Sequence, residues 1–201
     1  MGWFAKRRTP RTLSPVSGGA MIERCDGRTF AANDLLCIPA GWEALWVSGG
    51  AFSRVLREGD DRLPIEGRRE VEGDLYFIRL APEETFAWGC GGVRIGERTC
   101  GLHGSMRLEV ASSRKLLSAF IGEHMPFTAE RAFDRLLAQV LDAVACAARQ
   151  VAQDAGTLEG VQTQIADVAR EALEEPFERE GLAVAALTLE GIYISPGEQE
   201  V

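Results

Sequence analysis

The hydrophobic residues of this chain change their spacing near residue 111. Before that point they form short runs, continuous or alternating with polar residues, and breaks such as Pro39–Gly41 and Gly49–Gly50 separate them. Short runs divided by glycine are typical of strands joined by hairpin turns. The expected strands are Leu35–Ile38, Ala44–Val47, Ser53–Leu56 and Leu75–Ile78.

The clearest alternation lies between Gly101 and Val110. Leu102 and Met106 share one parity of this stretch, whereas His103 and Arg107 share the other. A period of two with apolar residues on one side predicts a half-buried strand, with His103 on its polar face.

After Val110 the apolar residues recur at helical spacing. A short helix is expected to begin at Ser112–Ser113, whose hydroxyls can cap its first turn, and to end at Gly122. Thr128 is expected to cap a longer helix with an apolar stripe from Phe133 to Val151. Such a stripe usually packs on a sheet, and its outer edge could also meet a partner.

A third helix is expected to open at Thr157 and to kink or end at Pro176, which lacks an amide hydrogen. A last strand is expected from Leu182 to Ile194. The order of strands, then helices, then one returning strand predicts an α+β fold, in which three helices pack on an antiparallel β-sheet closed by the C-terminal strand.

The first 33 residues differ from the rest of the chain. Prolines, glycines and basic residues are frequent up to about Ala20, a composition that favours turns over regular structure. We therefore expect a flexible basic N-terminal segment over residues 1–33 and one domain over residues 34–201, a size that suits a single core.

Composition limits the function classes. The chain has 46% hydrophobic and 26% charged residues, which is ordinary for a globular domain. Its net charge of −8 would repel a nucleic-acid backbone, so no nucleic-acid partner is expected. No apolar run approaches the ~20 residues that a membrane-spanning helix needs. Five cysteines without a CxxC pair or a secretory leader favour a reducing, cytoplasmic setting.

Three features could carry chemistry, and each has a plainer interpretation. The glycine-rich stretch Trp88–Gly96 lacks the Gly-Lys-Ser/Thr ending of a phosphate loop, so a bulged hairpin turn is expected. Cys100 and His103 could form a nucleophile pair or half a metal site, but neither has further ligands at characteristic spacing. Adjacent carboxylates such as Asp60–Asp61 are usually solvated. No catalytic residue, cofactor or metal is therefore expected.

Three segments together resemble the SPFH (stomatin, prohibitin, flotillin) or Band 7 family, in particular its bacterial virion-core-like branch. They are Cys37–Gly50 with Val55–Gly59, which looks like the opening hairpin, then Gly101–Gly122, and finally Ala169–Ile194, a helix, a Gly-Leu pair and a strand. The resemblance covers about residues 34–201 and implies a non-enzymatic scaffold domain. In place of the family's acidic-proline turn the chain has Ser112–Ser113.

The N-terminus also resembles that branch, where a glycine and aromatic residues precede basic ones. Aromatic side chains favour the bilayer interface, and cations gain roughly 1 kcal/mol each near an anionic leaflet. The membrane-contact candidates are Gly2, Trp3, Phe4, Lys6, Arg7, Arg8 and Arg11. The alternative is a disordered tail that touches no lipid.

The sequence thus leads to a scaffold that self-associates as a homo-oligomer or joins other protein subunits, with an anionic membrane surface as a further partner at the inner face of the cell membrane. The alternative is a structural or binding module of a larger intracellular assembly without lipid contact. An enzyme using Cys100 and His103 is the third hypothesis.

Overall fold

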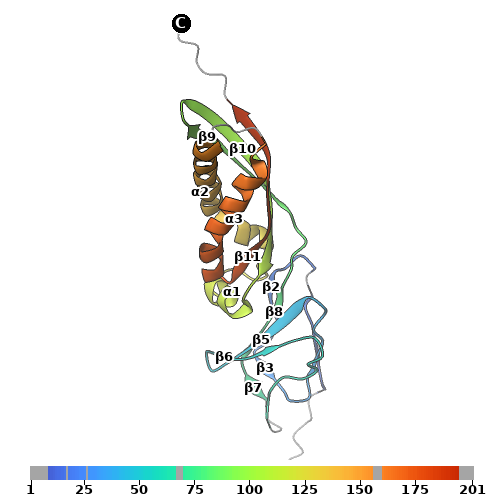
Figure 1. Ribbon diagram of the computed structural model, residues 1–201. Coiled ribbons are helices and arrows are strands. Elements are labelled where there is room, and N and C mark those ends of the chain that lie inside the picture. Colours follow the sequence, from blue (N-terminus) through green and yellow to red (C-terminus); the bar gives the residue numbers. More distant parts are fainter. Residues whose placement is uncertain (1–8, 17, 26, 67–69, 156–159, 195–201) are drawn as a thin grey trace, which may run out of the picture. The chain divides into compact units, whose positions relative to one another are not determined.

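The computed structural model describes residues 9–16, 18–25, 27–66, 70–155 and 160–194 (Figure 1). Its described part is α+β, with three helices, antiparallel sheets and a C-terminal strand, which confirms the predicted fold class. The chain forms two compact units. Unit 1 comprises Met1–Leu80 and Glu123–Phe127, and unit 2 comprises Ala81–Gly122 and Thr128–Val201.

Unit 1 is built around a four-stranded antiparallel sheet in the order β2-β8-β5-β6. Two short pairs accompany it: β1 lies parallel to β4, and β3 lies antiparallel to β7. The strands are β1 (Thr12–Leu13), β2 (Ile22–Arg24), β3 (Thr29–Phe30), β4 (Leu35–Leu36), β5 (Trp42–Ser48), β6 (Ala51–Leu56), β7 (Val71–Glu72) and β8 (Asp74–Arg79).

For the described residues from 9 to 33, the core of unit 1 corrects the prediction of a flexible segment over residues 1–33. Leu13 and Phe30, both from that segment, belong to the same buried cluster as Trp46 and Phe77. The Phe30 and Trp46 rings meet edge to face with centroids 4.9 Å apart. Prolines and glycines suggested a tail, but Gly18 and Gly19 lie in a turn between short strands whose apolar residues complete the core. The domain therefore does not start at residue 34.

Unit 2 contains a three-stranded antiparallel sheet in the order β11-β10-β9 and three helices. Helices α2 and α3 cover one face of this sheet (Figure 1). The elements are β9 (Phe86–Ile95), β10 (Arg98–Val110), α1 (Ser113–Phe120), α2 (Ala129–Ala155), α3 (Gln162–Arg179) and β11 (Leu182–Ile194). The bounds of β11 match the prediction.

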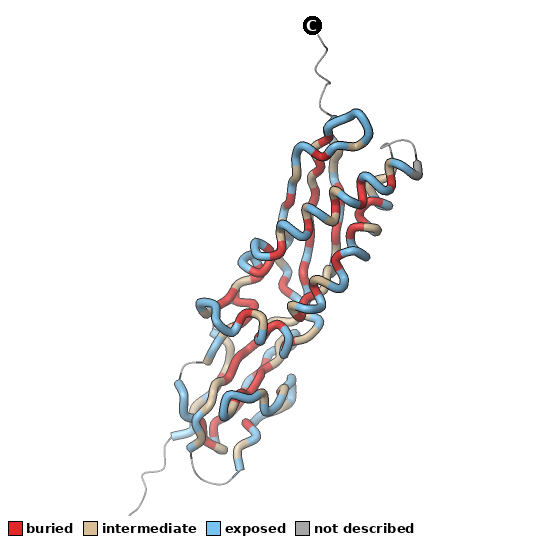
Figure 2. The backbone as a smooth tube through the Cα atoms, turned by 90° about the vertical axis from the view of Figure 1, so that its left-hand side faces the viewer, coloured by how far each residue is buried: buried red, intermediate tan, exposed pale blue. Residues whose placement is uncertain are grey.

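The alternation predicted for residues 101–110 is confirmed. Leu102, Met106 and Leu108 are buried, whereas Arg107 and Glu109 are exposed, and Figure 2 shows buried positions along the strands and the helices of the described chain. Burial of one parity follows from the one-sided cover by helices, because successive strand residues point to opposite faces.

Two of the three predicted helix starts are confirmed. The Ser112 hydroxyl accepts from Lys115 N at 3.4 Å, and the Thr128 hydroxyl accepts from Arg131 N at 3.3 Å. The third helix begins at Gln162, because Gly160 has a φ of +72° that no right-handed helix allows. The start expected at Thr157 lies outside the described residues. Helix α3 also runs past Pro176 to Arg179, so an early end there is wrong.

None of the helices described is both long enough and apolar enough to cross a bilayer.

Candidate functional site

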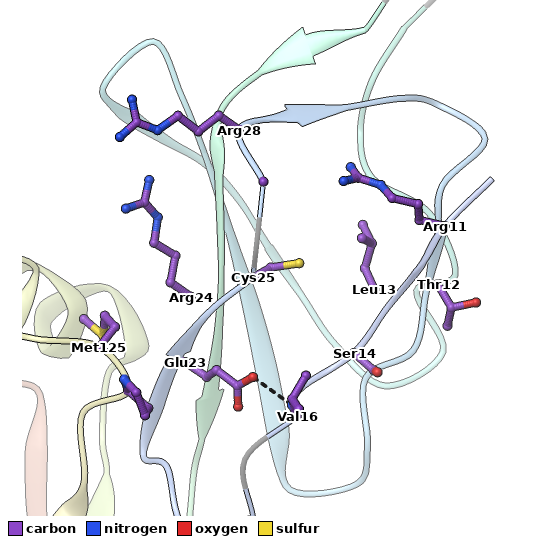
Figure 3. Close-up of a pocket in the computed structure, with 12 residues that line it drawn as sticks. Arg11, Thr12, Leu13, Ser14, Val16, Glu23, Arg24, Cys25, Arg28 and Met125 are labelled. Atoms are coloured by element: carbon purple, nitrogen blue, oxygen red, sulfur yellow. Dashed lines mark hydrogen bonds between the residues drawn. The ribbon is translucent and has the colours of Figure 1, made fainter. Parts of the chain in front are cut away.

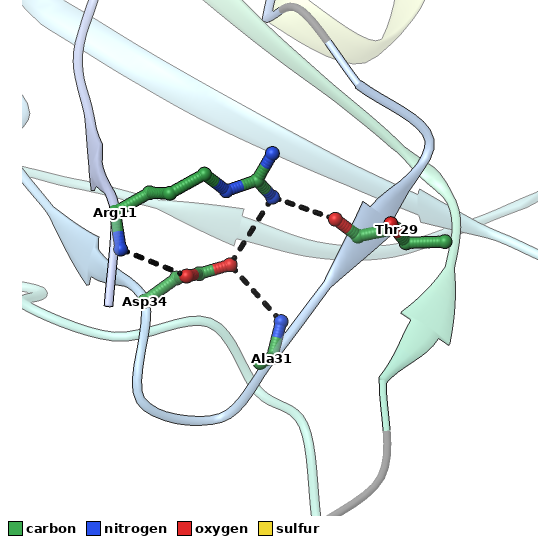
Figure 4. Close-up of polar contacts among 4 residues, drawn as sticks. All are labelled: Arg11, Thr29, Ala31 and Asp34. Carbon is green, nitrogen blue, oxygen red and sulfur yellow. Dashed lines mark hydrogen bonds and ion pairs between the residues drawn. The ribbon is translucent and has the colours of Figure 1, made fainter. Parts of the chain in front are cut away.

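Of the predicted membrane-contact residues, only Arg11 is described; Gly2, Trp3, Phe4, Lys6, Arg7 and Arg8 lie outside the described residues. The guanidinium of Arg11 is bound to other residues of unit 1 (Figure 4). Its Nη2 donates to Asp34 Oδ2 at 3.3 Å and to the Thr29 carbonyl at 2.6 Å. Its carbon lies 5.5 Å from the centre of the Phe30 ring, within the range of a cation–π contact.

Asp34 explains why Arg11 is held there. Its side chain is 0% exposed, and it accepts hydrogen bonds from two backbone amides, Arg11 N at 3.1 Å and Ala31 N at 3.0 Å. A buried carboxylate needs such donors and an opposite charge to offset its lost hydration. Arg11 is therefore a structural residue whose charge is compensated, and it is not one of the cations free to meet a lipid surface.

A groove of about 830 Å³ lies in unit 1, beside β1 and β2 (Figure 3). Arg11, Arg24 and Arg28 line it, together with Glu23. Its arginines suggest an anion site, but most of their charge is already offset.

Arg24 forms an ion pair with Asp74, and this hydrogen bond raises the pKa of the arginine. Glu23 adds a negative charge to the groove, and its Oε1 accepts from Val16 N at 2.8 Å. Arg11 is likewise paired, with Asp34. Of the three lining arginines, Arg28 is the one for which no ion pair to a described residue is seen. The groove is consequently close to neutral and offers no concentrated site for an anion.

Cys100 and His103 do not come together. Cys100 is 1% exposed on the helix-covered face of the sheet, whereas His103 lies on the opposite face, three positions along the same strand. Cys90 is only half-buried, and desolvation raises the pKa of its thiol, which disfavours the reactive thiolate. Across the described part of the chain, no group of three or more His, Cys, Asp or Glu residues has metal-binding geometry.

The glycine-rich stretch Trp88–Gly96 forms most of β9 and the turn that leads to β10. Its pairing with β10 shifts register between Cys100 and Leu102, opposite Gly91 and Gly92, and Gly96 has a φ of +59° at the turn. The expected bulge and hairpin turn are both present, although most of the stretch is strand. No helix follows that could complete a phosphate loop.

The face of the three-stranded sheet that points away from α2 and α3 carries a group of polar side chains, which we name the polar strip. Ser105 Oγ lies 2.8 Å from Thr188 Oγ1 and donates to Glu190 Oε1 at 2.7 Å. His103 Nε2 lies 3.3 Å from the Tyr193 hydroxyl, and the two rings stack with centroids 5.2 Å apart. All five residues come from β10 and β11.

Gly191 makes the position of the His103 ring possible. A Cβ at residue 191 would overlap the imidazole, so the ring lies directly over the bare backbone of β11. His103 and Gly191 are register partners, and Gly101 pairs with Tyr193 in the next row. In both rows a glycine lies opposite a large ring, so the rings of His103 and Tyr193 can lie flat on the sheet.

The outer edge of β11 is the second notable feature of unit 2. β11 is the terminal strand of its sheet, and no described residue forms a backbone ladder with its free side. The strand is 13 residues long, its only charged residue is Glu190, and it contains no proline. Register shifts mark irregularities next to Ala185 and Glu190.

The sequence predicted both strands of the polar strip but not the strip itself. Ser105, Thr188, Glu190 and Tyr193 were not singled out, because strand pairing and register were unknown. The available signal was the polar parity of Gly101–Val110, which includes His103 and Ser105.

Comparison of the chain with models of known protein families finds no match, and neither does comparison with curated proteins. Its function must therefore be inferred from its own geometry.

Proposed function

We propose that the chain is a non-enzymatic scaffold of the SPFH type, which its hairpin and closing segments resemble, and that it self-associates to organise partner proteins. The observation that supports this most is the three-stranded sheet of unit 2, which has one face and one long edge that no other described element of unit 2 covers.

An open edge strand is a template for another chain. Its free N–H and C=O groups can extend the sheet, and proteins that avoid such pairing usually protect their edges with lysine or proline. β11 has neither. Its two irregularities give partial protection, so a specific and limited contact is expected rather than open-ended aggregation.

The polar strip supports binding rather than catalysis. Ser105, Thr188 and Glu190 hydrogen-bond to one another, and His103 stacks on Tyr193, so these groups stabilise a flat surface. Cys100 lies on the other face of the sheet and cannot act with His103 as nucleophile and base. The third hypothesis, an enzyme, depended on Cys100 and His103 acting together, and this arrangement does not support it.

We place the scaffold at the cytoplasmic face of a membrane, where residues 1–8 would supply the aromatic and basic contacts. The second candidate is a module of an intracellular assembly that touches no lipid. One observation favours this second candidate: Arg11, one of the seven predicted contact residues, is paired with Asp34 of unit 1.

Self-association is tested by sedimentation velocity and light scattering over a wide concentration range. A concentration-dependent oligomer is expected, and a monomer at every concentration would refute the scaffold.

Lipid contact is tested separately by flotation with anionic and with neutral vesicles. The full chain is compared with a chain lacking residues 1–8, which keeps Arg11 and its bond to Asp34. Flotation of the full chain alone, and only with anionic vesicles, would support the membrane role. Equal behaviour of the two proteins would favour the assembly without lipid.

A further inference from the structure

The backbone geometry of β11 shows which of its groups face outward. Ala111 N donates to Gly181 O at 3.0 Å where the β10–β11 ladder begins. In an antiparallel ladder, successive residues direct their N–H and C=O groups alternately to one neighbour and to the other. The register shift near Ala185 leaves Thr188 as the partner of Ser105, so the backbone groups of Thr188 point to β10. By the same alternation, the backbone groups of Leu187 and Leu189 point to the free edge. No described residue bonds to them there.

We propose that β11 pairs antiparallel with β11 of a second copy, about a two-fold axis at Thr188, so that two three-stranded sheets become one of six strands. The inference rests on the proposed self-association and names its surface. A two-fold axis requires each residue to fit its counterpart, and Thr188 facing Thr188 meets that requirement.

The register that this axis imposes is complementary in charge. It places Glu190 of one copy opposite Ala186 of the other, and Ala186 in turn pairs with Arg107 of β10. Arg107 is exposed, and no ion pair of it with a described residue is seen. Two strand spacings separate the Cα atoms of Arg107 and the second Glu190 by roughly 10 Å, which these side chains can span across alanine. The symmetry forms this pair twice.

The irregularities near Ala185 and Glu190 confine the regular pairing to the segment between them. The contact is therefore short, and a weak, reversible dimer is expected.

Cysteine cross-linking tests the axis directly. Thr188 of one copy would lie opposite Thr188 of the other in a non-hydrogen-bonded pair. The Cα atoms of these two residues would then be about 4.5 Å apart, within the range that a disulfide spans. Thr188→Cys is compared with Ala172→Cys, at an exposed position of α3, both with the exposed Cys37 and Cys146 replaced by serine. In a glutathione redox buffer, Thr188→Cys should form disulfide dimers at least tenfold faster than Ala172→Cys. Equal rates would refute the axis.

A charge exchange tests the register independently. Arg107→Glu and Glu190→Arg should each weaken dimerisation about tenfold in sedimentation velocity, and the double variant should regain most of the wild-type affinity. Circular dichroism of each variant checks that the fold is retained. A double variant no better than the singles would refute the ion pair.

The two levels of the hypothesis fail in different ways. A wild-type dimer with neither selective cross-linking nor charge rescue would refute β11 pairing and leave self-association standing. A wild-type chain that stays monomeric would refute both.

Discussion

Replacement of Asp34 by alanine is the sharpest test of how unit 1 is held together. The carboxylate is fully buried and binds Arg11 N, Ala31 N and the Arg11 guanidinium at 3.0–3.3 Å. Asp34→Ala leaves both backbone amides without this acceptor. The amides of Arg11 and Ala31 should then lose protection, whereas β1 keeps its backbone bonds to the segment after Asp34 and the burial of Leu13.

The expected loss of unfolding free energy follows from the kind of bond removed. A hydrogen bond to a charged group contributes about 1.5–3 kcal/mol, and two backbone amides lose one each. The desolvation cost of the carboxylate is relieved at the same time, which offsets part of the loss. The guanidinium is 36% exposed and can rehydrate, so its ion pair adds at most about 1 kcal/mol. We expect a destabilisation of about 3 kcal/mol.

Arg11→Ala is the matched control. It removes the guanidinium but leaves the backbone amides of Arg11 and Ala31 bound to Asp34, so a loss of about 1–2 kcal/mol is expected. Urea unfolding gives the free energies, and hydrogen exchange reports the two amides directly. The reasoning would be refuted if Asp34→Ala unfolded within about 0.5 kcal/mol of the wild type while both amides kept their protection.

Three further predictions concern titration and reactivity. Burial raises the pKa of Tyr76, so the folded state holds this proton more tightly than the unfolded state; stability should fall as pH rises from about 10 through the raised pKa, and Tyr76→Phe should flatten this slope in urea unfolding. The hydrogen bond and charge of Lys115 lower the pKa of Glu178, so the NMR titration midpoint of Glu178 should lie below 4.5 and rise in Lys115→Met; an unchanged midpoint would contradict this. Alkylation of the native protein should label exposed Cys146 well before buried Cys100, and a hyper-reactive Cys100 would revive the enzyme hypothesis.

The sequence alone was sufficient for the local elements of the second half of the chain. The alternation of Gly101–Val110, the caps at Ser112 and Thr128 and the last strand Leu182–Ile194 all appear as predicted. These features depend on side-chain period and on bonds between residues three positions apart. Such interactions are local, so the residue order determines them.

The segment predicted to be flexible, residues 1–33, was misjudged in its described part for the opposite reason. Thr12–Leu13 and Thr29–Phe30 are strands of only two residues, too short to show a period. They are stable because Leu13 and Phe30 belong to the same buried cluster as Trp46 and because Asp34 binds Arg11. Those partners lie 16 to 33 positions away in the chain, and composition does not reveal them.

The candidate surface likewise combines both kinds of information. The sequence by itself determined that the strands Gly101–Val110 and Leu182–Ile194 and three helices exist, because hydrophobic period is a property of the chain. Only the tertiary structure decided that β10 pairs with β11, that His103 lies over Gly191 and that β11 is an edge. Strand pairing joins residues some 80 positions apart, and its register depends on the packing of the whole unit.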